Sequence, residues 1–267
     1  MLKVGIVGCG TIGSYLAKSI KRQYKNKIRL IGICDIDKKK IDSLRRSLKT
    51  KIPSYSLDSL INRCDLVIEA AAGKISASIV KKAIARKTDV MVMSVGGLLG
   101  HLSLIQKARK KIRLYIPSGA IAGLDALKAA RMGKISSVTL TTRKPLAGLR
   151  GADYIEKKKI DLDRIKKEKV IFKGTAQAAV SGFPKNINVA AILSLIGIGA
   201  KKTRVCIIAS AVTERNTHTI EIEGDFGKII CCTENVPSAL NPKTSQLAVL
   251  SAIATLDGIL DNARIGT

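Results

Sequence analysis

A glycine pattern at residues 8–13, with the sequence GCGTIG, lies between an apolar run at residues 2–7 and a helical pattern. Glycines at this spacing permit a tight turn, let the backbone approach a pyrophosphate, and let a helix pack closely on a strand. The unpaired N–H groups at the start of the helix then bind the phosphates. The candidate cofactor-binding residues of this turn are Gly8, Gly10, Thr11, Ile12 and Gly13.

An acidic residue, Asp35, ends the second apolar run, residues 28–34. A carboxylate about 20 residues beyond a glycine turn accepts hydrogen bonds from the adenosine ribose hydroxyls and repels a 2′-phosphate, so it favours NAD over NADP. The lysines at 38–40 follow at once and could neutralise a 2′-phosphate, which leaves NADP open. Strand, helix and acid together predict a dinucleotide-binding turn rather than a turn without a ligand.

His218 is the candidate acid–base residue. It lies between Thr217 and Thr219 in an alternating, strand-like run. Hydride transfer to a nicotinamide requires a base near the donor group that loses a proton, and imidazole with an unperturbed pKa of about 6.5 suits that task. The alternative is a hydrogen-bonded histidine on a sheet face. The second histidine, His101, begins a basic helical pattern and is expected to be a solvated surface residue.

The chain is strongly basic, with 47 Lys and Arg against 20 Asp and Glu and a formal net charge of +27. Such a charge attracts polyanions and small carboxylates. Specific nucleic-acid binding is not expected, because the basic residues are scattered and the chain has only three Phe, five Tyr and no Trp. Three cations at strand-end or loop positions are candidates for binding an anionic substrate group, namely Arg143, Lys144 and Lys185.

The six cysteines show no C-x-x-C spacing and mostly lie in apolar runs, which indicates buried thiols in a reducing compartment. No Cys/His cluster is present in the sequence, so no metal site is expected. A strand pattern begins by the third residue and no apolar stretch reaches membrane length, which argues against a signal peptide or a membrane span. We therefore expect a cytoplasmic protein.

The first part of the chain alternates strand and helix patterns with short connections. This alternation predicts a Rossmann-type doubly wound parallel sheet. Small residues at 70–73 and 117–123 follow two of its strands, where a ligand and a domain crossing are expected. The expected strands are residues 2–7, 28–34, 64–71, 89–95 and 112–116, and the expected helices are 11–24, 38–48, 57–63, 74–86 and 101–111.

From Ser136 the chain is rich in strand patterns with two helical segments, which predicts a second α+β domain with an open sheet and helices on one face. The charged segment 150–169 is expected to be an exposed excursion. Residues 241–245 are expected to start a C-terminal helix, 247–260, that packs back on the first domain. The expected domains are 1–120 with 241–267 for the dinucleotide, and 121–240 for substrate and dimerisation.

Three segments, with GDFG at 224–227, closely resemble the L-aspartate dehydrogenase family: SGAIAGLD at 118–125, FPKNINVAA at 183–191 and NTHTI at 216–220. The resemblance covers nearly the whole chain. It implies NAD- or NADP-dependent oxidation of L-aspartate to iminoaspartate, the entry step of a route to NAD synthesis, in a homodimeric two-domain enzyme. One departure is visible, because Ser-Ala-Val at 210–212 stands where an Asp-Pro pair is expected.

The resemblance also assigns residues. It places the catalytic histidine on His218 and cofactor contacts on Ala122 and Asn188. Asn188 can bond the nicotinamide carboxamide or hold the substrate in register, or it can merely cap its own helix. Asn241 is a further candidate for the cofactor and Ser118 for the substrate.

Two other functions stay open. A regulatory protein that senses the nicotinamide dinucleotide would keep the fold and need no base at the nicotinamide. A dehydrogenase or reductase of another small carboxylate would keep the same site residues and change only the substrate.

Overall fold

The computed structural model describes residues 1–183, 188–263, 265 and 266. The chain separates into two compact units. Unit 1 comprises Met1–Pro117 and Val249–Ala263, and unit 2 consists mainly of Ser118–Ala248. The sequence predicts domain boundaries near residues 120 and 240. The assignment of the cofactor to one domain and of the substrate to the other stays a prediction.

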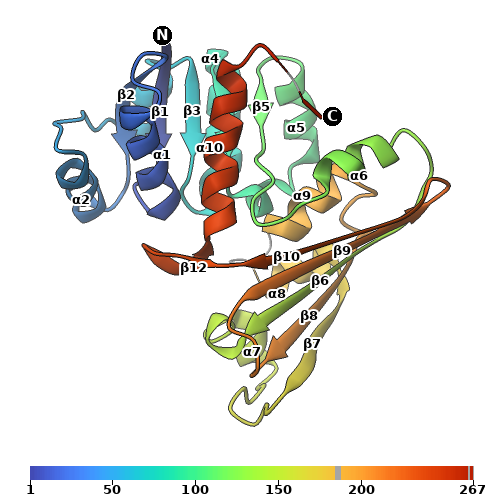
Figure 1. The fold of residues 1–267 in the computed structure, drawn as a ribbon. Helices are drawn as coiled ribbons and strands as arrows, with labels where there is room; N and C mark the ends of the chain where they lie inside the picture. The colour runs from blue at the N-terminus through green and yellow to red at the C-terminus, as the bar shows by residue number, and fades with distance from the viewer. Residues whose placement is uncertain (184–187, 264, 267) are drawn as a thin grey trace. The chain divides into compact units, whose positions relative to one another are not determined.

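A five-stranded parallel sheet forms the centre of unit 1 (Figure 1). Its order is β2-β1-β3-β4-β5. Parallel strands covered on both faces are apolar throughout, and Val4, Ile6 and Val67 are fully buried. The predicted doubly wound sheet is therefore confirmed. Its strands are β1 (Leu2–Val7), β2 (Ile28–Cys34), β3 (Leu66–Glu69), β4 (Asp89–Val92) and β5 (Leu114–Tyr115).

The helices of unit 1 bury one apolar face each. In α2, Ile41, Leu44 and Leu48 are buried at helical spacing, while the lysines at 38–40 are exposed. The helical segments before the domain crossing are α1 (Thr11–Arg22), α2 (Lys38–Leu48), α3 (Leu57–Ile61), α4 (Gly73–Arg86), the short 3-10 helix η1 (Val95–Leu98) and α5 (Leu102–Arg109).

The C-terminal helix α10 (Gln246–Leu260) runs beside α1 (Figure 1). Its Ala252 and Leu256 are fully buried in the same cluster as Leu16 and Ile20 of α1. The prediction that the C-terminal helix packs back on the parallel-sheet domain is therefore confirmed.

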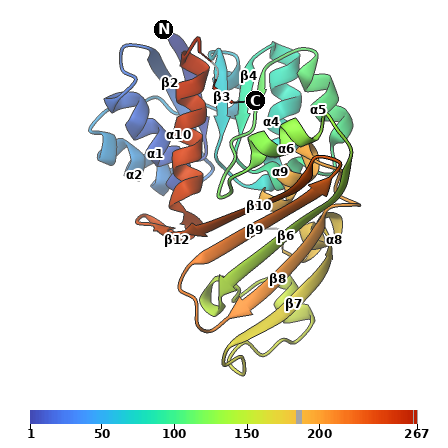
Figure 2. The same cartoon turned by 45° about the vertical axis from the view of Figure 1, so that its right-hand side comes forward.

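Unit 2 contains a mixed sheet of order β10-β9-β6-β8-β7, whose five strands lie side by side in Figure 2. Only β6 and β8 are parallel. On β6, Val138, Leu140, Thr142 and Lys144 alternate with less buried residues, so one face of the sheet is covered. The strands are β6 (Ile135–Pro145), β7 (Glu168–Thr175), β8 (Arg204–Ser210), β9 (Asn216–Gly224) and β10 (Gly227–Asn235), and the helices are α6 (Leu124–Ala130), α7 (Asp153–Lys157), α8 (Ala176–Gly182) and α9 (Asn188–Ile196).

The expectation that residues 241–245 start a helix is wrong. Residues Asn241–Ser245 form strand β12, paired with β11 (Pro237–Ser238), and do not start a helix; α10 begins only at Gln246. Pairing between segments has overridden the local helix-start signal.

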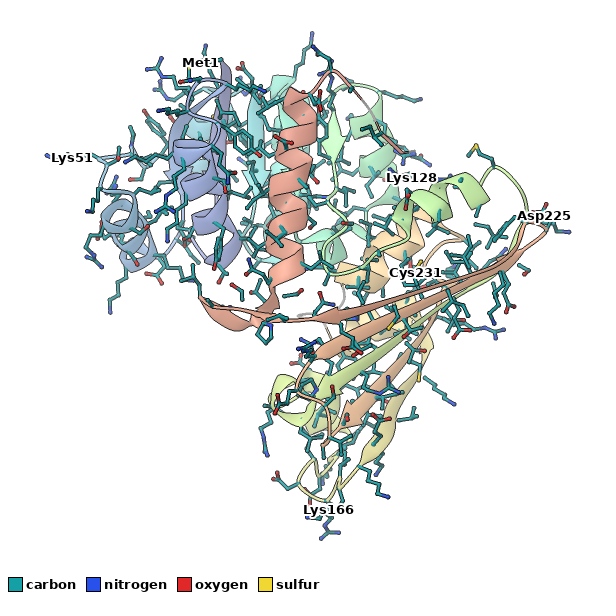
Figure 3. All side chains as sticks on the ribbon, in the orientation of Figure 1. Met1, Lys51, Lys128, Lys166, Asp225 and Cys231 are labelled. Atoms are coloured by element: carbon teal, nitrogen blue, oxygen red, sulfur yellow. The ribbon has the colours of Figure 1, made fainter. Side chains whose placement is uncertain are left out.

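The charged segment 150–169 is not entirely an exposed excursion. Its Ile155, Leu162 and Ile165 are buried. Tyr154 stacks on Phe183 with ring centroids 5.0 Å apart. These apolar anchors hold the segment on unit 2, while charged side chains such as Lys166 point away from it (Figure 3).

Among the described residues, no helix is both long and apolar enough to span a bilayer. All six cysteines are free thiols. Burial raises the pKa of the Cys9 and Cys64 thiols to about 12, so these two are unreactive core groups at neutral pH.

Candidate functional site

The turn between β1 and α1 has a geometry that only glycine permits at two positions. Gly8 has a φ of +99°, in the region that favours glycine, and a Cβ there would lie 2.4 Å from the Ala70 carbonyl oxygen. A Cβ on Gly13 would lie 1.9 Å from the Gly8 carbonyl oxygen. These close approaches bring the start of α1 against the carboxyl ends of β1 and β3.

Gly10, by contrast, faces open space. No described atom lies within 4 Å of the position of a Cβ there. Gly10 is also the N-cap residue of α1. The first turn of this helix, all of it described, contains no acidic residue, and no side chain caps its N–H groups. Half-buried Thr11 and Ile12 begin the helix. The backbone N–H groups of this turn thus fit a pyrophosphate, and the residues present fit a nicotinamide dinucleotide.

Asp35 is held beside this turn. Its Oδ2 accepts a hydrogen bond from the Cys9 N–H at 2.7 Å, and its Oδ1 accepts one from the Asp37 N–H at 2.9 Å. Asp37 in turn caps α2 by accepting from the Lys39 N–H. The Asp35 carboxylate has lone pairs beyond these two bonds, so its position and acceptor capacity suit ribose hydroxyls.

Glu69, which sequence reasoning missed, is fully buried at the end of β3. Its carboxylate accepts hydrogen bonds from the backbone N–H groups of Ala71, at 2.8 Å, and Ser94, at 2.9 Å. Burial raises its pKa, and these bonds oppose that rise. Glu69 therefore ties the loop after β3 to the loop after β4, at the sheet edge where α/β folds bind ligands. A single acid inside an apolar strand pattern is the one sequence signal that could have revealed it.

His218 lies in unit 2 on the covered face of the sheet and is only 6% exposed. It is directly opposite Thr142 in the β6–β9 ladder, and its Nδ1 lies 3.0 Å from the Thr142 hydroxyl oxygen. If Nδ1–H donates to Thr142, Nε2 keeps a lone pair that can accept a proton; the opposite tautomer makes Nε2 a donor.

The pKa of His218 is lowered to about 3, first by burial and then by the nearby charge of Lys144. The expectation of an ordinary imidazole pKa is therefore wrong, because sequence gave no measure of desolvation. The imidazole is neutral at physiological pH, as a base must be. Substrate carboxylates beside it would raise its pKa and strengthen it as a base.

The structure separates two neighbouring cations of β6. Lys144 is buried on the same face as His218. Arg143 lies on the other face, where its Nε donates to Glu168 Oε1 at 2.7 Å. The third candidate, Lys185, lies outside the described residues. Of the two candidate cations that the structure describes, only Lys144 lies together with His218.

The domain-crossing loop that carries Ser118 and Ala122 is anchored in unit 2. Its Ala120 carbonyl accepts hydrogen bonds from Thr233 Oγ1 and Asn235 Nδ2, each at 3.0 Å, and these residues belong to β10, next to the strand of His218. Ala122 is exposed and Ser118 is half-buried.

Asn235, a buried residue that sequence reasoning also missed, connects this loop to β12. Its Oδ1 accepts from the Ser245 hydroxyl at 2.5 Å, and half-buried Asn241 begins the same strand. Asn188 is the exposed first residue of α9. The roles of Ala122, Asn188, Asn241 and Ser118 stay predictions. On sequence alone, the Val-Pro that follows Asn235 is typical of a simple turn. It therefore gave no signal that Asn235 connects the domain-crossing loop to β12.

A glycine turn that fits a dinucleotide, at the carboxyl ends of a parallel sheet, is typical of NAD(P)-dependent dehydrogenases, and the mixed-sheet unit adds a buried neutral histidine that can act as a base. Two family models divide the chain between them. Residues 8–117 match the NAD-binding domain of homoserine dehydrogenase, and residues 125–259 match the C-terminal domain of aspartate dehydrogenase.

Full-length relatives agree with this division. L-aspartate dehydrogenases of Methanosarcina mazei and Methanosarcina acetivorans are 45% and 46% identical over 100% of both chains. The crystal structure of aspartate dehydrogenase from Thermotoga maritima has a TM-score of 0.76 at 23% identity, again over 100% of both chains, which shows a shared fold. The chain belongs to the L-aspartate dehydrogenase family.

Proposed function

We propose that this protein is an L-aspartate dehydrogenase, which oxidises L-aspartate to iminoaspartate with NAD or NADP. The observation that carries the proposal is the full-length identity of 45% to an L-aspartate dehydrogenase. The glycine turn with Asp35 and the buried His218 supply the two functional elements such a reaction needs, a dinucleotide site and a base.

In this proposal, the first turn of α1 binds the pyrophosphate and Asp35 binds the adenosine ribose. When bound, the nicotinamide supplies the hydride acceptor. His218 accepts a proton from the substrate amine through Nε2, with Nδ1–H donating to Thr142. The hydroxyl thereby fixes the tautomer and orients the ring.

The direct test is an absorbance assay at the NADH band with a panel of amino acids. L-Aspartate should give turnover well above the other amino acids. Tight NAD binding without oxidation of any amino acid would support a nicotinamide-sensing protein instead. Turnover of a different small carboxylate would keep the dehydrogenase class and replace the substrate.

Asp35→Ala should weaken NAD binding while changing NADP binding little or improving it. The reason is that the lost carboxylate bonds the ribose hydroxyls and repels a 2′-phosphate. The variant also removes the acceptor of the Cys9 N–H, but that loss loosens the turn equally for both cofactors. Titration of both cofactors against both proteins therefore gives the ratio of affinities as the readout. An unchanged ratio would show that Asp35 does not contact the ribose.

We also propose a homodimer formed through the mixed sheet of unit 2. Ile230 of β10 and Val170 of β7 are 60% and 46% exposed, and a second copy would remove such apolar groups from water. Light scattering at micromolar concentration should give twice the monomer mass, and Ile230→Lys should lower the measured mass toward the monomer. A monomer mass for the unmodified protein would contradict the proposal.

The product of the proposed reaction fits the entry step of a route to NAD synthesis, which we include in the proposal. A cytoplasmic location is proposed on the six free thiols, which accord with a reducing compartment. Neither specific nucleic-acid binding nor membrane association is part of the proposed function.

A further inference from the structure

Four polar side chains come together on the covered face of the unit 2 sheet. Thr142 is opposite His218 in the β6–β9 ladder, and Arg143 is opposite Thr217. The observed register ends at that pair, and continuing it by one antiparallel step puts Asn216 opposite Lys144. Because side chains alternate between the two faces of a sheet, these two residues share the face of Thr142 and His218. The four side chains therefore occupy adjacent positions on one face.

The Asn216 side chain has an unsatisfied acceptor. Its Oδ1 is buried and has no hydrogen-bond partner among the described residues. A Cβ built on Gly148, in the 3-10 helix η2 (Leu146–Gly148), would lie 4.0 Å from this oxygen. The next residue, Leu149, lines the cavity beside Lys144. The Asn216 oxygen therefore lies near the residue that precedes the cavity-lining Leu149. A buried polar atom left without a partner costs free energy and is explained by a ligand that supplies the missing donor.

Lys144 is 8% exposed and lines a cavity of about 10 Å³. This volume admits about one water-sized group, so only an end group of a substrate reaches the cavity. Burial lowers the pKa of the Lys144 ammonium to about 8. Besides Thr142, the described lining residues are apolar, namely Leu140, Leu149, Phe183, Ala190, Val205 and Ile207.

Two titratable side chains lie near Lys144 or near the wall of its cavity. His218 of β9 couples electrostatically to Lys144. Tyr154 of α7 stacks on Phe183, one of the cavity walls. The residues that β8 and α9 contribute to the wall, Val205, Ile207 and Ala190, do not titrate.

We propose that Lys144 and Asn216 bind the charged groups of the amino-acid substrate: the Lys144 ammonium holds a carboxylate, and Asn216 Oδ1 accepts a hydrogen bond from the α-ammonium group. This inference rests on the proposed function, and it names the residues that select a carboxylate-bearing amino acid. A charge-assisted pair in an apolar wall is stronger than one in water. Asn216 is two residues from His218 on one strand, so the substrate amine bound there lies on the side of the proposed base.

Proton linkage distinguishes this role from a structural one. A bound carboxylate favours the charged form of Lys144 and raises its pKa above about 8. Binding therefore takes up protons near pH 8, and affinity falls as pH rises through 8, where the free protein loses the Lys144 proton. His218 is neutral throughout this range and adds nothing to the linkage.

The experiment measures binding of succinate, a dicarboxylate without an amine, to the full-length protein with NAD present, by calorimetry at pH 7 and pH 9. Lys144→Met should weaken succinate binding about 10- to 100-fold at pH 7 and abolish the difference between the two pH values. Lys144→Arg should retain the affinity but lose the pH dependence, because guanidinium does not titrate there. Lys173→Met, an exposed lysine of β7, is the control and should behave like the unmodified protein.

Asn216→Leu tests the amine contact. It should raise the KM for L-aspartate about tenfold while leaving succinate affinity unchanged, since succinate has no ammonium group. Equal weakening of both ligands would show a general distortion and would overturn the Asn216 assignment.

Unchanged succinate affinity in Lys144→Met would overturn the Lys144 assignment. A lower succinate affinity at pH 9 than at pH 7 that persists in Lys144→Arg would also overturn it. The arginine variant keeps the test valid if Lys144→Met does not fold. Loss of kcat in both variants with intact succinate binding would make Lys144 a proton-transfer group instead. Because succinate binding needs no turnover, these results are separate from a failure of the unmodified protein to oxidise L-aspartate.

Discussion

His218→Ala lowers kcat for L-aspartate oxidation by about 10²- to 10⁴-fold, the usual contribution of a positioned acid or base. Affinity for NAD stays near its original value, because His218 is proposed to act on the substrate amine while the pyrophosphate binds the glycine turn. The measurements are steady-state oxidation and NAD titration for both proteins. His101→Ala, at the exposed histidine before α5, is the matched control and keeps the original rate.

The pH profile gives a second readout. With a pKa of about 3, the His218 imidazole is neutral across the working range, so a rise of oxidation rate above pH 7 comes from other groups, such as the substrate ammonium. The variant should therefore show a lower profile of the same shape above pH 6. A limb near pH 6.5 in kcat/KM, which reports the free enzyme, that disappears in His218→Ala would contradict the pKa set by burial. An unchanged rate in the variant would mean that His218 is not the base.

Gly13→Ala abolishes measurable NAD binding and destabilises the protein. Its Cβ would lie 1.9 Å from the Gly8 carbonyl oxygen, a backbone atom that can move only if the whole turn moves. Forcing one carbon into such a contact costs about 1–3 kcal/mol of folding free energy. The displaced turn no longer presents its N–H groups to a pyrophosphate. Thermal unfolding without cofactor and NAD titration measure the two effects.

Gly10→Ala is the matched comparison within the same turn. Its backbone, with φ of −75° and ψ of −160°, suits alanine, and no described atom lies within 4 Å of the new Cβ. Stability without cofactor should stay unchanged, while NAD affinity should fall about 10- to 100-fold because the methyl group occupies space that the pyrophosphate approaches. Normal NAD affinity in Gly10→Ala would show that the pyrophosphate does not approach at this residue.

Local rules account for what could be predicted in unit 1. The apolar run before Gly8, the helical spacing of Ile41, Leu44 and Leu48, and the acid at Asp35 each depend on residues near one another in the chain. Alternating strands and helices leave few topologies besides a doubly wound sheet. For this reason the parallel sheet and the covering C-terminal helix were predictable, and the glycine turn could be proposed as a cofactor site.

Contacts between distant segments decide what sequence could not. Asn241–Ser245 carries helix-start residues but forms β12, because β11 offers it a strand partner. Glu69 and Asn235 have no local motif. Their roles arise only where Ala71 and Ser94, or Ala120 and Ser245, are brought to them by the fold.

For the candidate site, the sequence by itself determined which residue types are present. The alternation of side chains along a strand also placed Arg143 and Lys144 on opposite faces of that strand. Only the tertiary structure decided which face the rest of unit 2 covers. Covering that face buried His218 beside Lys144 and lowered both pKa values, to about 3 and about 8. Desolvation depends on every atom packed around a group, and most of those atoms belong to residues far away in the sequence.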